Sequence, residues 1–241
     1  PEFAYVMTLA LDIAARSGGA FDPAMGVPTD LWGFGPPGPR AGLPSETEIE
    51  AALAASGHDA LDFDPLLLRL RRTRAVQLDL SGIAKGYAVD AVAARLRALG
   101  CADFLIEIGG ELLGAGIQPD GQPWWVDVET PPGLPPVLPL RIGLHGLAVA
   151  TSGDYRRAFV AGGSTYAHTI DPRTARPVAN GVASVTVLHR DCARADAWAS
   201  ALCVLGPGTG MALAKREGLA AHMLTRDGGD HLSPALEAML G

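Results

Sequence analysis

The chain has 241 residues, with 26 acidic and 19 basic side chains and a formal net charge of −7 at pH 7. Because 48% of its residues are hydrophobic and only 19% are charged, the composition excludes a mainly disordered chain. The acidic balance argues against nucleic acid as a partner, since the only basic stretch is the short one from Arg69 to Arg74. We expect a single folded domain over residues 1–241, because neither a repeat nor a linker divides the sequence.

Cysteine usage and hydropathy exclude further classes of protein. Cys101, Cys192 and Cys203 lack the spacing of a metal knuckle and lie among small or apolar residues, so we predict three buried free thiols. No apolar stretch reaches the roughly 18 residues that a membrane span needs, so we predict no spanning segment in this chain. The sequence opens abruptly, and we expect that an N-terminal portion is missing.

The first third of the chain predicts a helix, a loop and a second helix. Apolar residues at helical spacing predict a helix over residues 3–17, which Gly18 and Gly19 end. Residues 21–39 are rich in glycine and proline around Trp32 and Phe34, which is typical of a long functional loop. Ser45 followed by Glu48 is a capping box that predicts the start of a short helix, with Gly57 as its stop.

The next segments predict a strand–helix unit. Residues 66–70 and 75–80 have the pattern of two strands joined by a turn at 71–74, with Asp79 at the end of the second strand. A helix follows from Ser81 as N-cap to Leu99. Its apolar stripe is predicted to be Ile83, Tyr87, Ala91, Ala94 and Ala98.

The remainder alternates between strand-like and helix-like segments. Strands are predicted over residues 104–108, 124–128, 137–142, 147–150, 182–188 and 223–224. Helices are predicted over residues 193–205, 211–217 and 233–240. Because only one strand–helix–strand unit is evident among runs of strands, the pattern favours an α+β fold over a doubly wound sheet.

Three segments carry residues suited to chemistry. In residues 78–90 a small-residue turn leads into a helix that carries Lys85 in its first turn, which is either a phosphate site or simply a capped helix start. Asp196 and Ser200 lie four residues apart on one helical face, where they form either a pair of Mg²⁺ ligands or a solvated polar stripe. His168 precedes an Asp-Pro turn and is either a general base or a structural histidine.

Two further turns contain glycines that permit close backbone approach to a ligand. They are Gly109-Gly110-Glu111 and Thr151-Ser152-Gly153. The alternative is that both are only tight turns.

Together and in this order, the segments resemble the ApbE family of FAD:protein FMN transferases over essentially the whole chain. The resemblance lies in residues 19–23 and 31–35, 79–90, 109–111, 151–155, 168–174 and 195–197. Its specific parts are the block Asp-x-x-Gly-Ile-Ala-Lys-Gly-Tyr from Asp79 and the block His-x-Ile-Asp-Pro-Arg-Thr from His168. The implied fold is α+β, with mixed, mainly antiparallel sheets and flanking helices, here without the family's N-terminal segment.

The resemblance implies a reaction and a set of site residues. FMN would pass from FAD to a threonine hydroxyl of an acceptor flavoprotein, with Mg²⁺ required and AMP released. The implied Mg²⁺ ligands are the carbonyl of Gly82, the carboxylate of Asp196 and the hydroxyl of Ser200. The implied flavin-nucleotide contacts are Asp79, Lys85, Gly109, Gly110 and Ile170. His168 is the candidate base for the acceptor hydroxyl, and Asp196 is counted with it as catalytic.

The sequence departs from the family pattern at two positions, and three alternative functions remain open. Ser200 stands where many members have threonine, and Ala175 stands where the family usually has a glycine of positive φ. The alternative functions are an FAD-binding protein, a Mg²⁺-dependent FAD pyrophosphatase giving FMN and AMP, and a folded but inactive domain. By family habit we expect a periplasmic or lipoprotein-anchored location after removal of a leader, with a cytoplasmic location kept open.

Overall fold

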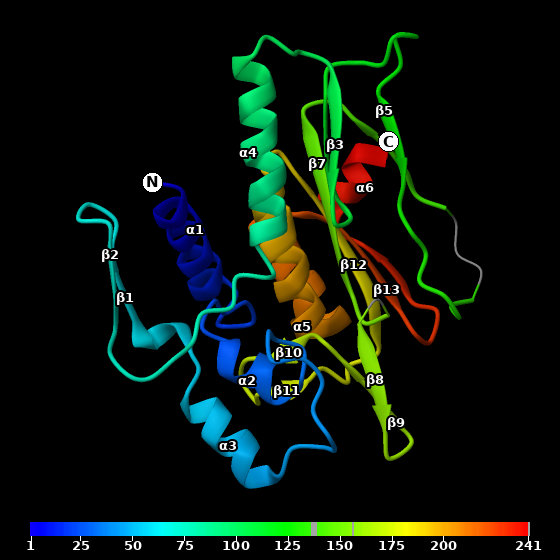
Figure 1. Cartoon of the computed structure of the whole chain (residues 1–241). Coiled ribbons are helices and arrows are strands. Elements are labelled where there is room, and N and C mark those ends of the chain that lie inside the picture. Colours follow the sequence, from blue (N-terminus) through cyan, green and yellow to red (C-terminus); the bar gives the residue numbers. More distant parts are fainter. Residues whose placement is uncertain (136–138, 156, 241) are drawn as a thin grey trace. The chain divides into compact units, whose positions relative to one another are not determined.

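The computed structural model describes residues 1–135, 139–155 and 157–240 (Figure 1). The chain forms two compact units: Pro1–Ser81 with Asp154–Asn180, and Gly82–Gly153 with Gly181–Gly241. All strand pairs among the described residues are antiparallel, and helices accompany the sheets in both units. The α+β prediction is therefore confirmed, while the number of domains stays a prediction.

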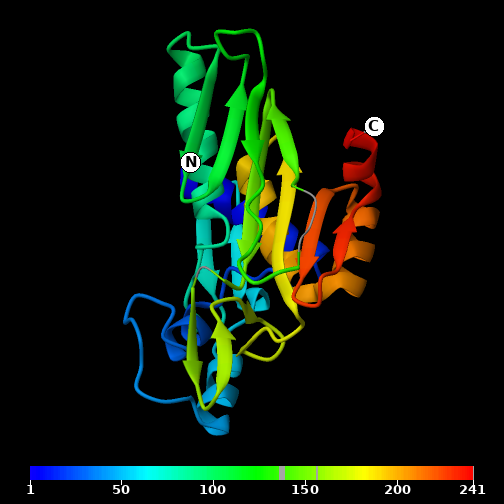
Figure 2. The ribbon, with the colours of Figure 1, turned by 90° about the vertical axis from the view of Figure 1, so that its right-hand side faces the viewer.

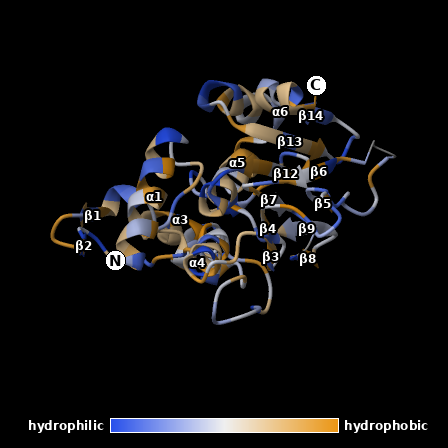
Figure 3. Cartoon of the chain, turned by 90° about the horizontal axis from the view of Figure 1, so that it is seen from above, coloured by the Kyte–Doolittle hydropathy of each residue, from blue (hydrophilic) through white to orange (hydrophobic). Residues whose placement is uncertain are grey.

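The second unit is built on a six-stranded sheet (Figure 2). Its strand order is β14 (Asp230–Leu232), β13 (Ala220–Thr225), β12 (Val182–His189), β7 (Leu147–Gly153), β4 (Glu111–Ala115) and β3 (Phe104–Ile108). The helices α4 (Ala84–Ala98) and α5 (Cys192–Glu217) pack on one face of this sheet, as the view from above shows (Figure 3). The α6 helix (Pro234–Leu240) packs against β13.

Alternation along the strands gives this sheet two apolar faces. Leu113 of β4 and Ala148 of β7 pack with α4, whereas their neighbours Leu112 and Val149 belong to a cluster on the opposite face. That second cluster includes residues of the hairpin formed by β5 (Trp124–Asp127) and β6 (Arg141–Leu144). The sheet is thus covered on both sides, which holds its strand ends in fixed positions.

The helix α5 contains a break that the sequence predicts. Gly206 has φ 75° and ψ −179°, which is not helical, so α5 consists of two helices joined at a kink. Pro207 is the first residue of the second helix. The two predicted helices over 193–205 and 211–217 correspond to them. By length and composition α5 also meets the criterion for a membrane span, contrary to the expectation that no stretch does, yet 61% of the apolar window is buried within the fold.

The start and the buried face of α4 differ from the sequence prediction. Ser81 is not the N-cap, because the helix begins after Ile83 and has no side-chain cap. Of the predicted stripe only Ile83, which precedes the helix, is buried, and Ala91, Ala94 and Ala98 are exposed; the buried positions within the helix are Gly86, Val89 and Ala93. Small residues occupy the buried face because α4 packs closely along α5.

The first unit contains three helices and three two-stranded hairpins among its described residues. The helices are α1 (Glu2–Arg16), α2 (Gly26–Leu31) and α3 (Glu46–Ala54), with a short 3₁₀ turn at His58–Ala60. The hairpins are β1 (Leu61–Asp64) with β2 (Arg69–Arg72), β8 (Ala158–Ala161) with β9 (Ser164–Ala167), and β10 (Ile170–Asp171) with β11 (Arg176–Pro177). The capping box is present, since Ser45 and Glu48 exchange side-chain and backbone hydrogen bonds.

Three predictions about secondary structure are wrong, and local hydrogen bonds explain the clearest case. Residues 66–68 form a hairpin tip instead of a strand, because Asp64 Oδ1 accepts the amides of Leu66 and Leu67 and Leu68 has φ 53°. Residues 75–80 form no strand, and the loop over 21–39 contains α2. The sequence prediction also omitted β1, β4, β8, β11 and β14, while residues 137–138 of the predicted strand 137–142 lie outside the described residues.

Candidate functional site

Three charged side chains meet inside the second unit. Lys85, in the first turn of α4, bonds through Nζ to the carboxylate of Glu111 at the start of β4. The same Nζ lies 3.5 Å from Oδ1 of Asp196 on α5. Asp196 and Glu111 are 2% and 1% exposed, so one ammonium group serves two buried carboxylates. We call these three residues the charged cluster.

The pKa values of both carboxylates in the charged cluster are raised, so both groups ionise less readily than an exposed carboxylate does. Burial raises the pKa of Asp196, and the attraction of Lys85 opposes that rise. Burial also raises the pKa of Glu111, and the neighbouring Asp196 raises it further. In addition, Oε2 of Glu111 is buried and has no hydrogen-bond partner. Such a pair of carboxylates, short of positive charge, is typical of a functional site rather than of a structural ion pair.

Close packing between α4 and α5 positions Asp196. A Cβ atom on Gly86 would lie 2.4 Å from the carbonyl oxygen of Cys192, so only glycine allows this approach of the helices. The Gly86 amide, one of the unpaired donors of the first turn, donates to Oδ2 of Asp196 at 3.1 Å. Asp90, one turn further along α4, accepts the amides of Cys192 and Ala193 at 2.8 and 2.9 Å and thereby caps α5.

The tight turn between β3 and β4 positions Glu111. Gly109 and Gly110 have φ 62° and 96°, and the amide of Gly110 donates to Glu107 at 2.7 Å. A Cβ atom on Gly109 would lie 3.2 Å from the Lys85 side chain, so the turn passes directly beside that lysine. Gly109 therefore approaches Lys85 closely, while close approach of this turn to a ligand stays a prediction.

A second polar pair lies one helical turn beyond Asp196. The hydroxyls of Ser200 on α5 and Ser152 on β7 are 3.1 Å apart, and Thr151 is paired in the same way with Thr186 at 2.8 Å. Ser200 lies four residues after Asp196 in the continuous part of α5, so both side chains are on the same helical face. Gly82 lies in the turn that leads into α4.

The donors of this region suit a hard cation. Among the described residues, no group of three His, Cys, Asp or Glu side chains suited to a metal is present. The oxygen donors on this face of α5 are instead the carboxylate of Asp196 and the hydroxyl of Ser200, and the unpartnered Oε2 of Glu111 belongs to the same charged cluster as Asp196. Mg²⁺ prefers few protein ligands, all oxygen, and a divalent charge would offset the crowded carboxylates. The residues present therefore fit Mg²⁺.

The other predicted site residues belong to the first unit. Asp79 Oδ2 accepts the Thr29 hydroxyl at 2.9 Å and its Oδ1 accepts the Ser81 amide at 2.9 Å, which fixes the carboxylate in place. Ile170 is 8% exposed and packs in an apolar cluster with Trp32 and Ala175. Ala175 has φ 53°, so the positive-φ turn expected of a glycine is kept with alanine. Its carbonyl accepts the indole N–H of Trp32 at 2.8 Å.

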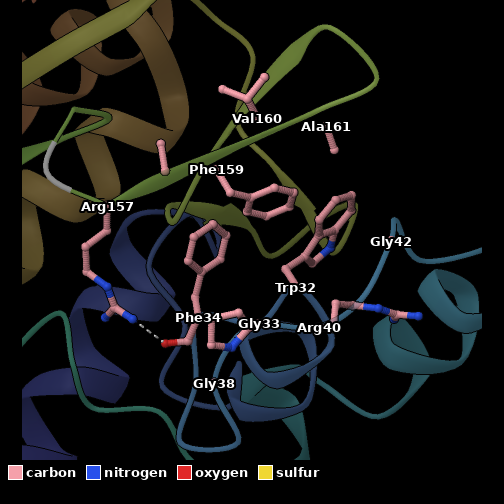
Figure 4. Close-up of a pocket in the computed structure, with 12 residues that line it drawn as sticks. Trp32, Gly33, Phe34, Gly38, Arg40, Gly42, Arg157, Phe159, Val160 and Ala161 are labelled. Atoms are coloured by element: carbon pink, nitrogen blue, oxygen red, sulfur yellow. Dashed lines mark hydrogen bonds between the residues drawn. The ribbon is translucent and has the colours of Figure 1, made fainter.

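His168 follows β9 and lies among aromatic side chains. Its Nδ1 is 3.1 Å from the carbonyl oxygen of Arg157, which can only accept, so Nδ1 carries the proton and Nε2 is the basic nitrogen of the neutral ring. The Phe34 ring meets the imidazole edge-on at 6.2 Å, and Phe34 also contacts Phe159 at 5.6 Å. Phe159 and Phe34 line a pocket of the first unit together with Trp32 (Figure 4).

The structure thus joins part of the predicted site. It brings Lys85, Asp196 and Gly109 together, with Ser200 one turn further along α5, while Asp79, His168 and Ile170 are described with the other unit. Sequence reasoning gave Glu111 no role. The available signal was an acidic residue directly after a strand-end glycine pair, which is weak because exposed turns often contain one.

Comparisons with known proteins agree with this description. The sequence model of the ApbE family matches residues 1–223. The FAD:protein FMN transferase of Escherichia coli K12 is 32% identical over 245 residues, covering 98% of this chain and 69% of the relative. The enzyme of the same name from Vibrio cholerae is 37% identical over 221 residues, covering 92% and 66%.

Solved structures give the same result. The crystal structure of the Pseudomonas stutzeri flavinyl transferase ApbE, in its apo form, matches with a TM-score of 0.89 and 41% identity, covering 98% of this chain and 74% of that one. The flavin transferase ApbE from Vibrio cholerae matches with a TM-score of 0.89 and 35% identity, covering 99% and 76%.

Proposed function

Since the chain belongs to the ApbE family, we propose that it is an FAD:protein FMN transferase that requires Mg²⁺. In this reaction the acceptor threonine hydroxyl attacks the FMN phosphorus of FAD, a phosphoester bond forms, and the pyrophosphate bond breaks with release of AMP. The proton of the hydroxyl passes to a base. The observation that carries the proposal is the charged cluster, in which Lys85 bonds to buried Glu111 and faces buried Asp196.

The charged cluster supports phosphoryl transfer because that reaction is catalysed mainly by positioning and charge stabilisation. Asp196, Ser200 and the Gly82 carbonyl would hold Mg²⁺. When bound, the ion supplies stabilisation of the negative charge on the transferring phosphoryl group. Lys85 is held by Glu111 and its side chain is partly exposed, so it is positioned to bind a phosphate oxygen.

His168 supports the proposal from the first unit. Its hydrogen bond to the Arg157 carbonyl orients the ring and places the proton on Nδ1. Nε2 can therefore accept the proton of the acceptor hydroxyl. Asp79, fixed by Thr29 and by the Ser81 amide, is an oriented acceptor for a donor group of the flavin nucleotide.

The test is an incubation of the protein with FAD, with and without Mg²⁺, together with an acceptor domain that the Vibrio cholerae relative flavinylates in the same assay. We expect a fluorescent acceptor band in a denaturing gel and AMP in the supernatant, both dependent on Mg²⁺. Asp196→Ala removes both products, and Asp120→Ala, an exposed carboxylate of the same unit, is the matched control.

The outcomes separate the alternatives. AMP without a labelled acceptor indicates FAD pyrophosphatase activity. Tight FAD binding without either product indicates a binding protein. Equal activity of Asp196→Ala and the unsubstituted chain contradicts the assignment of the charged cluster.

A further inference from the structure

A pocket of about 510 Å³ in the first unit is bordered by the edge of a strand (Figure 4). Its lining comes from two segments, the loop 32–42 and residues 157–161, which are β8 and the residue before it. The second segment comprises five consecutive residues: Arg157, Ala158, Phe159, Val160 and Ala161. Consecutive side chains of a strand point to opposite faces, so a continuous run borders a pocket only where the edge of the strand faces it.

This edge of β8 has no strand beside it within the described part of the chain, since β8 pairs only with β9. The His168 amide donates to the Arg157 carbonyl at 3.0 Å, so Arg157 and His168 form a hydrogen-bonded pair of the ladder. This determines which residues of β8 bond to β9 and which do not. Because the bonds of an antiparallel pair alternate, Phe159 and Ala161 direct their backbone groups toward β9. Ala158 and Val160 direct theirs to the open edge, and Val160 is 72% exposed.

The charge and shape of the pocket lining indicate which kind of ligand can bind at this edge. Among the residues that the structure describes, the lining holds Arg40 and Arg157 and no acidic residue. Arg40 is paired with Glu48, whereas the described residues give the Arg157 guanidinium only the carbonyl of Phe34, at 2.8 Å. Trp32, Phe34 and Phe159 provide an apolar wall. An extended peptide with an acidic side chain and a neighbouring apolar side chain complements all of these features.

We infer that the open edge of β8 binds an extended segment of the acceptor protein by strand addition, with an acidic side chain of that segment at Arg157. The inference rests on the proposed function and names how its protein substrate is recognised. Arg157 is directly opposite His168 in the ladder. The bound segment would therefore lie on the other side of β8 from the candidate base, two strands across the sheet. The backbone of β8 provides affinity, and Arg157 provides selectivity.

The first test changes the open edge alone. Val160→Pro removes an outward N–H and leaves the amides that face β9 intact, while Val160→Thr keeps the N–H and the β-branched shape. The probe is a fluorescein-labelled peptide that contains the modified threonine and the nearest acidic residue of the acceptor domain used above. Binding is measured by fluorescence anisotropy with the full chain, without FAD. Loss of one backbone hydrogen bond and of strand continuity predicts at least about fivefold weaker binding for Val160→Pro.

The second test changes the charge and does not depend on the proline variant folding. Arg157→Glu weakens binding of the peptide about tenfold, and a peptide in which lysine replaces the acidic residue binds this variant better than it binds the unsubstituted chain. Circular dichroism and melting temperature establish that each variant is folded. The readout on the reaction is a raised KM for the acceptor.

These results separate the inference from the proposed function. Peptide binding that depends on Val160 and Arg157 supports the inference even when no FMN transfer occurs. If Val160→Pro and Arg157→Glu both bind the peptide as the unsubstituted chain does, strand addition at β8 is wrong, whatever the activity.

Discussion

The backbone amide of Gly86, in the first turn of α4, donates a hydrogen bond to Oδ2 of Asp196 on α5 at 3.1 Å. This bond places a buried carboxylate at the positive end of a helix, where the dipole and an unpaired amide both stabilise negative charge. It exists because α4 carries no side chain at position 86 and so approaches α5 closely. One glycine therefore determines both the packing of the two helices and the position of a candidate Mg²⁺ ligand.

Gly86→Ala is expected to destabilise the protein by about 3 kcal/mol, because the new methyl group meets backbone atoms that cannot move independently. The nearest are the Cys192 carbonyl oxygen at 2.4 Å and the Ala193 Cα at 2.7 Å. Urea unfolding measures the change. The matched control is Gly208→Ala on the partner helix α5, where a Cβ meets nothing within 4 Å, and a gain of about 0.5–1 kcal/mol is expected. Equal effects of the two substitutions would contradict the packing account.

Glu111→Gln is expected to raise stability while lowering activity. Burial and Asp196 raise the pKa of Glu111 above its ordinary value, so its ionisation destabilises the fold. The cost is absent below the ordinary pKa, grows as pH rises from the ordinary value to the raised one and is constant above it, so the gain for Gln is larger at about pH 8 than at about pH 4. Activity falls about 10- to 100-fold, because Lys85 loses the group that orients it.

The control for this prediction is Glu107→Gln, an exposed carboxylate in the same hairpin. Melting temperatures across pH and AMP release give both readouts. A Glu111→Gln protein that is less stable than the unsubstituted chain at every pH would show that the Lys85 ion pair outweighs the burial of the carboxylate.

Leu68→Gly is expected to stabilise the protein by about 0.5–1 kcal/mol. Leu68 has φ 53° and is 58% exposed, so glycine relieves strain and little burial is lost. Leu67, its exposed neighbour, has no positive φ, and Leu67→Gly is expected to destabilise slightly. Ala175→Gly should be close to neutral, because Ala175 has the same φ of 53° but is fully buried, and the lost methyl offsets the relieved strain. Urea unfolding of the three variants ranks these effects.

One cysteine of the native protein is expected to react quickly with a thiol reagent. Cys101 is exposed, which corrects the prediction of three buried thiols, whereas Cys192 and Cys203 are buried. Burial strongly raises the pKa of Cys192, and the nearby Asp90 raises it further, so its reactive thiolate is suppressed. Titration with Ellman's reagent should give a fast phase that Cys101→Ala abolishes and Cys203→Ala leaves intact. A second fast thiol in the folded Cys101→Ala protein would contradict the burial.

The His58 and Asp22 pair is expected to lose its stabilising effect in alkaline solution. The hydrogen bond from His58 to Asp22, at 2.8 Å, raises the pKa of the imidazole despite partial burial. The contribution is fully present below the ordinary pKa of histidine and is lost as pH rises through the raised value. The melting-temperature difference between the unsubstituted chain and His58→Gln should therefore shrink by about 2 °C between about pH 6 and about pH 9. His145→Gln is the control, and an equal pH trend in both variants would refute the assignment.

The sequence by itself determined the features that depend on local chemistry. The capping box at Ser45, the break of α5 at Gly206 and the strands over 104–108 and 182–188 follow from nearest-neighbour preferences and periodicity, and the structure contains all of them. The pairing of Asp196 with Ser200 on one helical face follows from helix geometry alone. The family resemblance also lies in the sequence, because its motifs are continuous blocks.

Only the tertiary structure decided which residues meet. The role of Glu111 depends on a turn that brings β4 beside α4, and its burial depends on packing between elements that are distant in the chain. The buried face of α4 follows from the close approach of α5, which overrides the apolar stripe predicted from hydropathy. The open edge of β8 likewise cannot be predicted from the sequence, because it depends on which strands pair with β8 in the folded chain. Long-range contacts set these features, and local residue preferences contain no information about them.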